Sequence, residues 1–437
     1  MNRSKQFILF MFILLSMCAF CLSCSTRGKQ PSVVLIIIDT LRADHLSCYG
    51  YSRNTSPVID SLAGSGIMMK NACSQAAWTL PATTSIMSGL SSRSHGAGMD
   101  VRTGRVFGLD PGMPLIATIM NGNGYATAGF FNVYLLGSDF GFHRGFEAFS
   151  CRDNGDGFAR QTVDAAVAWL EDAGGDKPFF LAVHFFDVHD PYDPPDPYDR
   201  YFTADGLQGD TFWEFTPDGA VKNQERLDYL MGLYDGEIAY VDHELGRLFS
   251  SLRRLGLSDN TLVILTADHG EEFLEHGYVG HGRTFYPEIV HVPLIFSGSG
   301  IENGVGVSSA CGQFDILPTI LDYCDLPSPE WQDGVSLFDT DARDNRVIPS
   351  SGINTGEDFE QVSIRNIDEL LIWNAETDEL EMYDLRTDPM AREPAAQPDS
   401  DMIERALYYW STPCHWNPVL LEDWQVAPIL HDLGYVK

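Results

Sequence analysis

The sequence predicts an α/β fold, in which a mostly parallel sheet is sandwiched by helices and a small antiparallel subdomain follows at the C-terminus. Two observations carry this prediction. Apolar, strand-like runs alternate with helical patterns over most of the chain, and short alternating runs replace them near its end. A chain of 437 residues with 44% hydrophobic residues is also long enough to bury one large core and a smaller one.

The predicted parallel strands are continuous runs of β-branched and aromatic residues. A strand that is buried on both faces reads as an unbroken apolar run, whereas a half-exposed strand alternates between apolar and polar residues. We expect such strands over residues 33–39, 125–131, 179–186, 261–268 and 292–297. Helical patterns over residues 159–173 and 224–255 lie between them, as the crossover connections of a parallel sheet require.

The C-terminal part of the chain carries a different pattern. After Gly334 the sequence becomes more polar, and two short alternating runs, QVSIRN and ELLIWNA, are followed by a turn at 376–378 and the run ELEMYDL. Such runs are typical of an antiparallel meander or hairpin. We therefore predict a main domain over residues 31–335 and a smaller C-terminal subdomain and tail over residues 336–437.

The N-terminus has the features of an export signal. It has a basic start, an apolar run over residues 7–15, and Ser23 immediately before Cys24. The apolar run is shorter than the about 20 residues of a membrane span. Because Ser23-Cys24 resembles a bacterial lipoprotein cleavage site, we expect residues 1–24 to be a signal peptide and Cys24 to anchor the protein to a membrane of the cell envelope, facing the periplasm or the exterior. Plain secretion is the alternative.

The charge of the chain limits the classes of partner. There are 28 basic and 61 acidic residues, which gives a formal net charge of −33. This balance argues against nucleic-acid binding and against electrostatic adhesion to anionic lipid. An anionic substrate would then need a locally positive site, and a bound metal ion is the simplest source of that charge.

Potential metal ligands follow two of the predicted strands. Asp39 ends the first strand, and Asp268 with His269 ends the fourth. The working residues of such sheets gather beyond the carboxyl ends of the strands, so these side chains are expected to meet in space. Carboxylates and imidazole together suit zinc, manganese or calcium. The alternative is that the two acids only cap the loops that follow.

Several segments, in order along the chain, resemble the sulfatase family. They are VVLIIIDTLRADHLSCYGY, WTLPATTSIMSGL, FFLAVHFFDVHDPYDPP, TLVILTADHGEEFLEHGYVGHGRTFY, FDILPTILDYCDLP, ELEMYDLRTDP and HDLGYVK. The resemblance implies an alkaline-phosphatase-like fold, one divalent metal ion held by Asp39, Asp268 and His269, and a small-molecule, glycan or lipid ester as substrate. Thr40 stands where sulfatases usually have a second Asp, which weakens the case for calcium relative to zinc or manganese.

The nucleophile position departs from the family pattern. Sulfatases make a formylglycine from the Cys or Ser of a C/S-x-P-x-R motif, and here Thr79 and Thr83 take the places of the Cys and the Arg around Pro81. No formylglycine is therefore expected. In relatives such as phosphodiesterases and phosphoglycerol or phosphoethanolamine transferases, a metal-bound Thr is the nucleophile, and Thr79 would sit at the positive start of a helix. An ordinary helix cap is the alternative.

Other polar residues fall at positions where the family binds substrate or protonates the leaving group. His189 and His281, the latter in place of a common Lys, are candidates for either role. Alternatively, Asp187 could join them to hold a second ion, although one metal is expected. Weaker candidates for substrate contact are Asn132, Arg42 and Arg283, and either arginine could instead form a structural ion pair. His184 and His276 are interpreted as structural.

These patterns together predict a metal-dependent hydrolase of sulfuric or phosphoric esters with a Thr nucleophile. One alternative is a transferase that moves a phosphoglycerol or phosphoethanolamine group to an envelope acceptor. Another is a catalytically silent binding protein that keeps the fold, which the missing second Asp, Cys and Arg suggest.

Overall fold

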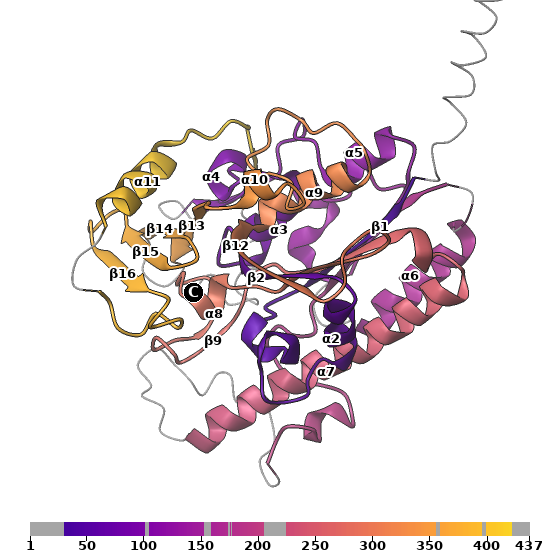
Figure 1. The fold of residues 1–437 in the computed structure, drawn as a ribbon, viewed down its shortest axis with the longest axis horizontal. Coiled ribbons are helices and arrows are strands. Elements are labelled where there is room, and N and C mark those ends of the chain that lie inside the picture. The colour runs from indigo at the N-terminus through magenta and orange to yellow at the C-terminus, as the bar shows by residue number, and fades with distance from the viewer. Residues whose placement is uncertain are drawn as a thin grey trace, which may run out of the picture.

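A central sheet of eight strands forms the core of the computed structural model (Figure 1). The structure describes residues 30–100, 105–152, 159–173, 175, 177–204, 224–354, 359–395 and 399–421. The predicted signal peptide over residues 1–24, with Cys24, lies outside the described residues.

The central sheet has the strand order β12-β2-β11-β8-β1-β7-β5-β6. Its members are β1 (Ser32–Ile38), β2 (Ile67–Cys73), β5 (Ala126–Phe131), β6 (Ala148–Cys151), β7 (Phe179–Phe185), β8 (Thr261–Ala267), β11 (Leu294–Ser297) and β12 (Val305–Gly312). All neighbours pair in parallel except β11, which runs antiparallel to both β2 and β8. Every residue of β1 is buried, as a strand inside a two-sided sheet requires.

Helices cover both faces of this sheet. On one face α6 (Ala159–Ala173), α7 (Gln224–Arg254) and α2 (Pro57–Gly64) pack together, and on the other lie α3 (Thr79–Ser88), α5 (Ile116–Gly122) and α9 (Ile316–Tyr323), as Figure 1 shows. Shorter helices are α4 (Ser92–His95), α8 (Pro287–Val290) and α10 (Thr340–Arg343). Among the described helices, none is long and apolar enough to cross a membrane.

The C-terminal part forms a second, antiparallel sheet. Its strands are β13 (Ile348–Asn354), β14 (Phe359–Arg365), β15 (Glu369–Asn374) and β16 (Leu380–Asp384), and α11 (Ser400–Ser411) packs on β14 and β15. The predicted antiparallel C-terminal unit is confirmed. Small sheets are formed by β9 (Glu272–Phe273) with β10 (Val279–Gly280), and by β17 (Val419–Leu420), β4 (Arg105–Gly108) and β3 (Gly98–Asp100). The domain boundary near residue 335 stays a prediction.

Candidate active site and metal centre

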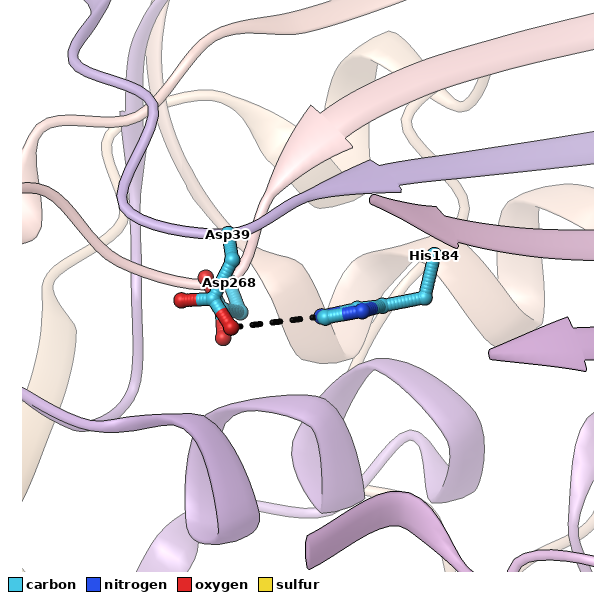
Figure 2. Close-up of side chains that lie close together, drawn as sticks. All are labelled: Asp39, His184 and Asp268. Carbon is cyan, nitrogen blue, oxygen red and sulfur yellow. Dashed lines mark ion pairs between the residues drawn. The ribbon is translucent and has the colours of Figure 1, made fainter. Parts of the chain in front are cut away.

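The candidate site lies at the carboxyl ends of three adjacent strands. Asp39 follows β1 and Asp268 follows β8, while His184 is near the end of β7, where it pairs with Ile37 of β1. Because β7 and β8 flank β1, the three side chains point toward one another (Figure 2). Asp39, Asp268 and His184 are all fully buried. The site is thus built by the parallel register of the central sheet.

The spacing of these atoms suits a shared cation better than direct hydrogen bonds. His184 Nε2 lies 3.5 Å from Asp39 Oδ2, and His269 Nε2 lies 3.6 Å from Asp39 Oδ1 and 3.5 Å from Asp268 Oδ2. A good N–H···O bond is about 2.9 Å long. Ligands that are each about 2.1 Å from one tetrahedral ion lie roughly 3.4 Å apart. The observed separations match those expected between ligands of one metal ion.

Buried polar atoms without hydrogen-bond partners provide a further test of whether a metal ion fits this site. Within the described residues, Asp39 Oδ1, Asp268 Oδ2 and His184 Nε2 are buried without a hydrogen-bond partner. Burial, and then the charges of Asp268 and Glu271, raise the pKa of Asp39 well above 3.8. A cation among these carboxylates would offset their mutual repulsion and the cost of burying their charge, so the donor set fits a divalent metal.

The two histidines are held in the form that binds metal. Burial lowers the pKa of His184 and of His269 to about 3, so both imidazoles are neutral. His269 Nδ1 lies 2.9 Å from the carbonyl oxygen of Gly270 and His184 Nδ1 lies 3.3 Å from Asn132 Oδ1, so each Nδ1–H donates outward. Nε2 of each ring is thereby left with its lone pair toward the carboxylates.

Asn132 supports this arrangement from behind. Besides accepting from His184, its side chain is hydrogen-bonded to Asp187, whose Oδ1 accepts from the backbone N–H of Ala159 at 2.7 Å. The amide of Asn132 therefore orients His184, and the prediction that it also orients a substrate oxygen stays a prediction. Sequence reasoning also missed His184, which we had interpreted as structural.

Thr79 lies at the centre of the site. It is the first residue of α3, and Trp78 occupies the N-cap position before it. Thr79 Oγ1 is 3.5 Å from Asp39 Oδ2 and 3.4 Å from His269 Nε2. Its hydroxyl therefore faces the same point as the candidate metal ligands, at the positive end of a buried helix.

Thr40 and Thr83 also depart from the family pattern, but their hydroxyls do not face the candidate metal ligands. Thr40 has a left-handed backbone with φ of 52°, and its hydroxyl donates to the carbonyl oxygen of Val188 at 2.8 Å. Its backbone N–H donates to Asp268 Oδ1 at 3.3 Å, so Thr40 supports a ligand through its backbone. Thr83 is buried one turn along α3, and its hydroxyl has no partner within the described part of the chain.

His189 and His281 lie beside His269. The ring centroids of His281 and His269 are 4.5 Å apart, and those of His189 and His281 are 4.8 Å apart. His281 Nδ1 is 2.9 Å from Glu271 Oε1, and Tyr192 donates to the other oxygen of Glu271 at 2.8 Å. Glu271, which the sequence reasoning did not select, thus fixes the orientation of His281.

The predicted second-ion set is not gathered in the structure. His189 and His281 are neighbours, but Asp187 is turned toward the start of α6. Groups of three potential ligands within the described residues are Asp39–His184–Asp268 and Glu272–His276–Glu288, and neither contains Asp187.

The two candidate arginines differ. The guanidinium of Arg42 is buried and makes four hydrogen bonds, two to Asp44, one to Glu275 and one to the carbonyl oxygen of Glu271. Four of the five N–H donors of its guanidinium are thus used within the protein, which favours the structural ion pair over the alternative. A substrate contact of Arg42 stays a prediction. Arg283 is half-buried over the Tyr278 ring. Burial, and then the charges of His189 and Arg283, lower the pKa of His281.

Comparison with known proteins identifies the family of this chain. The Sulfatase family profile matches residues 31–326. An arylsulfatase of Clostridium perfringens is 26% identical over an alignment that covers 82% of this chain and 89% of the relative.

Solved structures of similar fold include the phosphonate monoester hydrolase of Agrobacterium radiobacter, with a TM-score of 0.70, 21% identity, and coverage of 93% of this chain and 95% of that one. Another is a protein in complex with its substrate D-glucosamine-2-N,6-O-disulfate, with a TM-score of 0.70, 20% identity, and coverage of 87% and 97%. These likenesses confirm the predicted alkaline-phosphatase-like fold. Because the profile matches more than half of the chain, the protein belongs to the sulfatase family and is a sulfatase-like ester hydrolase.

Proposed function

We propose that this protein is a metal-dependent hydrolase in which the Thr79 hydroxyl attacks the central atom of a phosphoric or sulfuric ester. The observation that carries the proposal is the position of Thr79 Oγ1, 3.5 Å from Asp39 Oδ2 and 3.4 Å from His269 Nε2. A threonine with only a structural role at the start of a helix is not expected to face two potential metal ligands in a buried site.

The candidate ligands are Asp39, Asp268, His184 and His269. A divalent ion bound there would lower the pKa of the Thr79 hydroxyl and neutralise the nonbridging oxygens of the ester. Two carboxylates with two imidazoles favour zinc or manganese over calcium, which prefers six to eight oxygen ligands.

The residues around Thr79 account for the movement of protons and bonds. Thr79 Oγ1 forms a bond to phosphorus or sulfur while its proton passes to Asp39 Oδ2, which lies 3.5 Å away. The bond to the leaving oxygen breaks, and His281 or His189 supplies a proton to that oxygen. Water then attacks the central atom of the Thr79 ester and returns a proton to the histidine that gave one up. The bond to Thr79 Oγ1 breaks, and the proton on Asp39 returns to this oxygen, so the acid is released and the hydroxyl is restored.

The choice between phosphorus and sulfur follows from the single hydroxyl of Thr79. Without a formylglycine, the covalent ester on Thr79 can be released only when water attacks its central atom. Relatives that use a Thr nucleophile act on phosphorus, and the phosphonate monoester hydrolase shares this fold. We therefore favour a phosphodiester or phosphonate monoester over a sulfate ester.

The test compares hydroxyl-bearing and hydroxyl-free variants of α3. The metal-stripped protein is reloaded with zinc, manganese or calcium and assayed on aryl esters of a phosphodiester, a phosphonate and a sulfate. Thr79→Val is expected to lose at least about 10³-fold in kcat/KM, whereas Thr79→Ser keeps measurable turnover. Thr83→Val, a matched change one turn along the helix, should stay near wild type. Equal activity of Thr79→Val and wild type would overturn the proposal.

A further inference from the structure

An aromatic cavity of about 510 Å³ lies between the body of the protein and the C-terminal subdomain. Its walls come from the start of α3, from α4, from β3 and β4, and from the segment 410–418 at and after the end of α11. In Figure 1, α4 lies between α3 and α11. The volume is within the about 300–1,000 Å³ of sites that bind small ligands.

This cavity adjoins the catalytic site through a shared wall. Trp78, a wall residue, directly precedes Thr79, so their Cα atoms are about 3.8 Å apart. The carbonyl oxygen of Ala77 accepts a hydrogen bond from the N–H of Gly282 at 2.9 Å, next to His281. A substrate that reacts at Thr79 and extends past this segment would therefore enter the cavity.

Two tryptophans form fixed platforms in the wall. Trp410 packs edge-on against Trp373 at 5.7 Å, and the guanidinium of Arg93 lies 4.1 Å from its ring. Trp416 packs edge-on against Trp331 at 5.9 Å. Both Trp410 and Trp416 are half-buried, so each keeps surface for a ligand while its neighbours hold it in place.

The polar groups of the cavity are both donors and acceptors. Arg93 lies 3.7 Å from Glu360. The other polar side chains of the lining include Asp100, Asn417, Ser92 and Ser351. One basic and two acidic side chains give the lining a net negative charge, so an anionic ligand is disfavoured. A purely apolar ligand would bury these groups without replacing their hydrogen bonds to water, which is costly.

A sugar ring meets both requirements, since its C–H face stacks on an aromatic ring and its hydroxyl rim both donates and accepts hydrogen bonds. We propose that the cavity binds a neutral sugar unit of a glycan whose ester lies at Thr79. The position of the ester rests on the proposed function, whereas the binding of sugar does not.

Calorimetric titration of the full chain with cellohexaose, chitohexaose and agarohexaose tests the site directly. At least one of these is expected to bind, and Trp410→Ala or Trp416→Ala should weaken its Kd at least about tenfold. Trp169→Ala, at a half-buried tryptophan on α6 outside the cavity, is the matched control and should bind as wild type. If Trp410→Ala does not fold, Trp410→Phe takes its place in the binding measurement.

A chemical block of the cavity needs no change in its aromatic residues. Cys414 lines the cavity, is exposed and is unpaired as a thiol. Attachment of a bulky maleimide should abolish hexasaccharide binding in wild type but not in Cys414→Ser. The proposal is overturned if none of the three hexasaccharides binds, or if the tryptophan variants and the block leave Kd unchanged.

The same proteins separate this proposal from the assignment of Thr79. Trp410→Ala should hydrolyse a small aryl ester at the wild-type kcat/KM, and Thr79→Val should bind hexasaccharide with the wild-type Kd. If the protein binds sugar but Thr79→Val turns over the ester as fast as wild type, only the proposed function is refuted. If turnover depends on Thr79 but no sugar binds, only the cavity proposal is refuted.

Discussion

Two groups in this protein each contain two carboxylates and one imidazole, yet their surroundings differ. In Asp39–His184–Asp268 and in Glu272–His276–Glu288, one potential ligand atom from each residue lies within 4.8 Å of the others. Composition and spacing alone would make both groups metal sites. The hydrogen bonds of their atoms distinguish them.

The second group is closed by the protein itself. Glu272 accepts from the backbone N–H groups of His276 at 3.0 Å and Tyr278 at 2.9 Å. His276 uses Nδ1 on Glu288 and Nε2 on the carbonyl oxygen of Ala391, and its ring stacks on Tyr286 at 3.6 Å. Its imidazole is therefore fully engaged, and the group acts as a structural ion pair.

In the first group, by contrast, several of the atoms that could bind a metal have no protein partner in the part of the chain that the structure describes. Three of its buried ligand atoms have no hydrogen bond within the described residues, compared with one, Glu288 Oε2, in the second group. A metal centre is thus recognised by which polar atoms the fold leaves without partners. The following predictions test this difference, from the largest expected effect to the smallest.

The largest effect is expected from a matched pair of amide substitutions. Asp39→Asn removes a charged ligand, so turnover should fall at least about 10³-fold and bound metal should be lost. Glu288→Gln should keep both the metal, measured by elemental analysis, and turnover per folded molecule. Loss of metal from the Glu288 variant with retention in the Asp39 variant would reverse the assignment of the two groups.

Added metal should stabilise the protein through the first group alone. At a free metal concentration 100 times its Kd, the free energy of unfolding should rise by about 2.7 kcal/mol, seen as a higher Tm. His276→Gln should keep this rise, and Asp268→Asn should abolish it. An equal rise in wild type and the Asp268 variant would place the ion elsewhere.

The support behind His184 should have a smaller effect. Asn132→Ala removes the acceptor that fixes His184 Nδ1–H, and loss of such a partner typically costs about 10–100-fold in metal affinity. Competition with a fluorescent chelator measures this change. Unchanged affinity would mean that packing alone orients His184.

Sequence reasoning found the strands and the residues that follow them, but not what depends on contacts across the fold. The apolar runs at β1, β7 and β8 identified buried strands, and the acids at two of their ends led to Asp39 and Asp268. The run of β11 carries no sign of its direction, which is antiparallel. Directions of pairing depend on tertiary contacts rather than on local pattern.

His184 and Arg42 show the same limit for side chains. His184 lies inside an apolar strand, so it resembled a core residue until the register with β1 placed it beside Asp39. The ion pair of Arg42 with Glu275 was not evident because the two residues are 233 positions apart in the sequence. A ligand set that joins three strands can be read from sequence only where each member ends its strand.

The smallest predicted effect is the pH dependence of the second group. Burial alone would lower the pKa of His276, but the hydrogen bond and charge of Glu288 raise it above 6.5. The pair therefore stabilises the fold fully below about pH 6.5, and this contribution is lost as pH rises through the folded pKa. His276→Gln should cost about 1–2 kcal/mol at pH 6 and less at pH 9, as urea unfolding measures. A cost that grows with pH would contradict the ion pair.

The central claim is that Thr79 becomes covalently bound during turnover at the first group. Acid quenching during hydrolysis of an aryl phosphodiester or phosphonate, followed by peptide mass spectrometry, detects such an ester. We predict a phosphorus-containing adduct on Thr79 and none in Thr79→Ser except on the new serine. An adduct on another residue, or rapid turnover without any adduct under conditions where its breakdown limits the rate, would contradict the account.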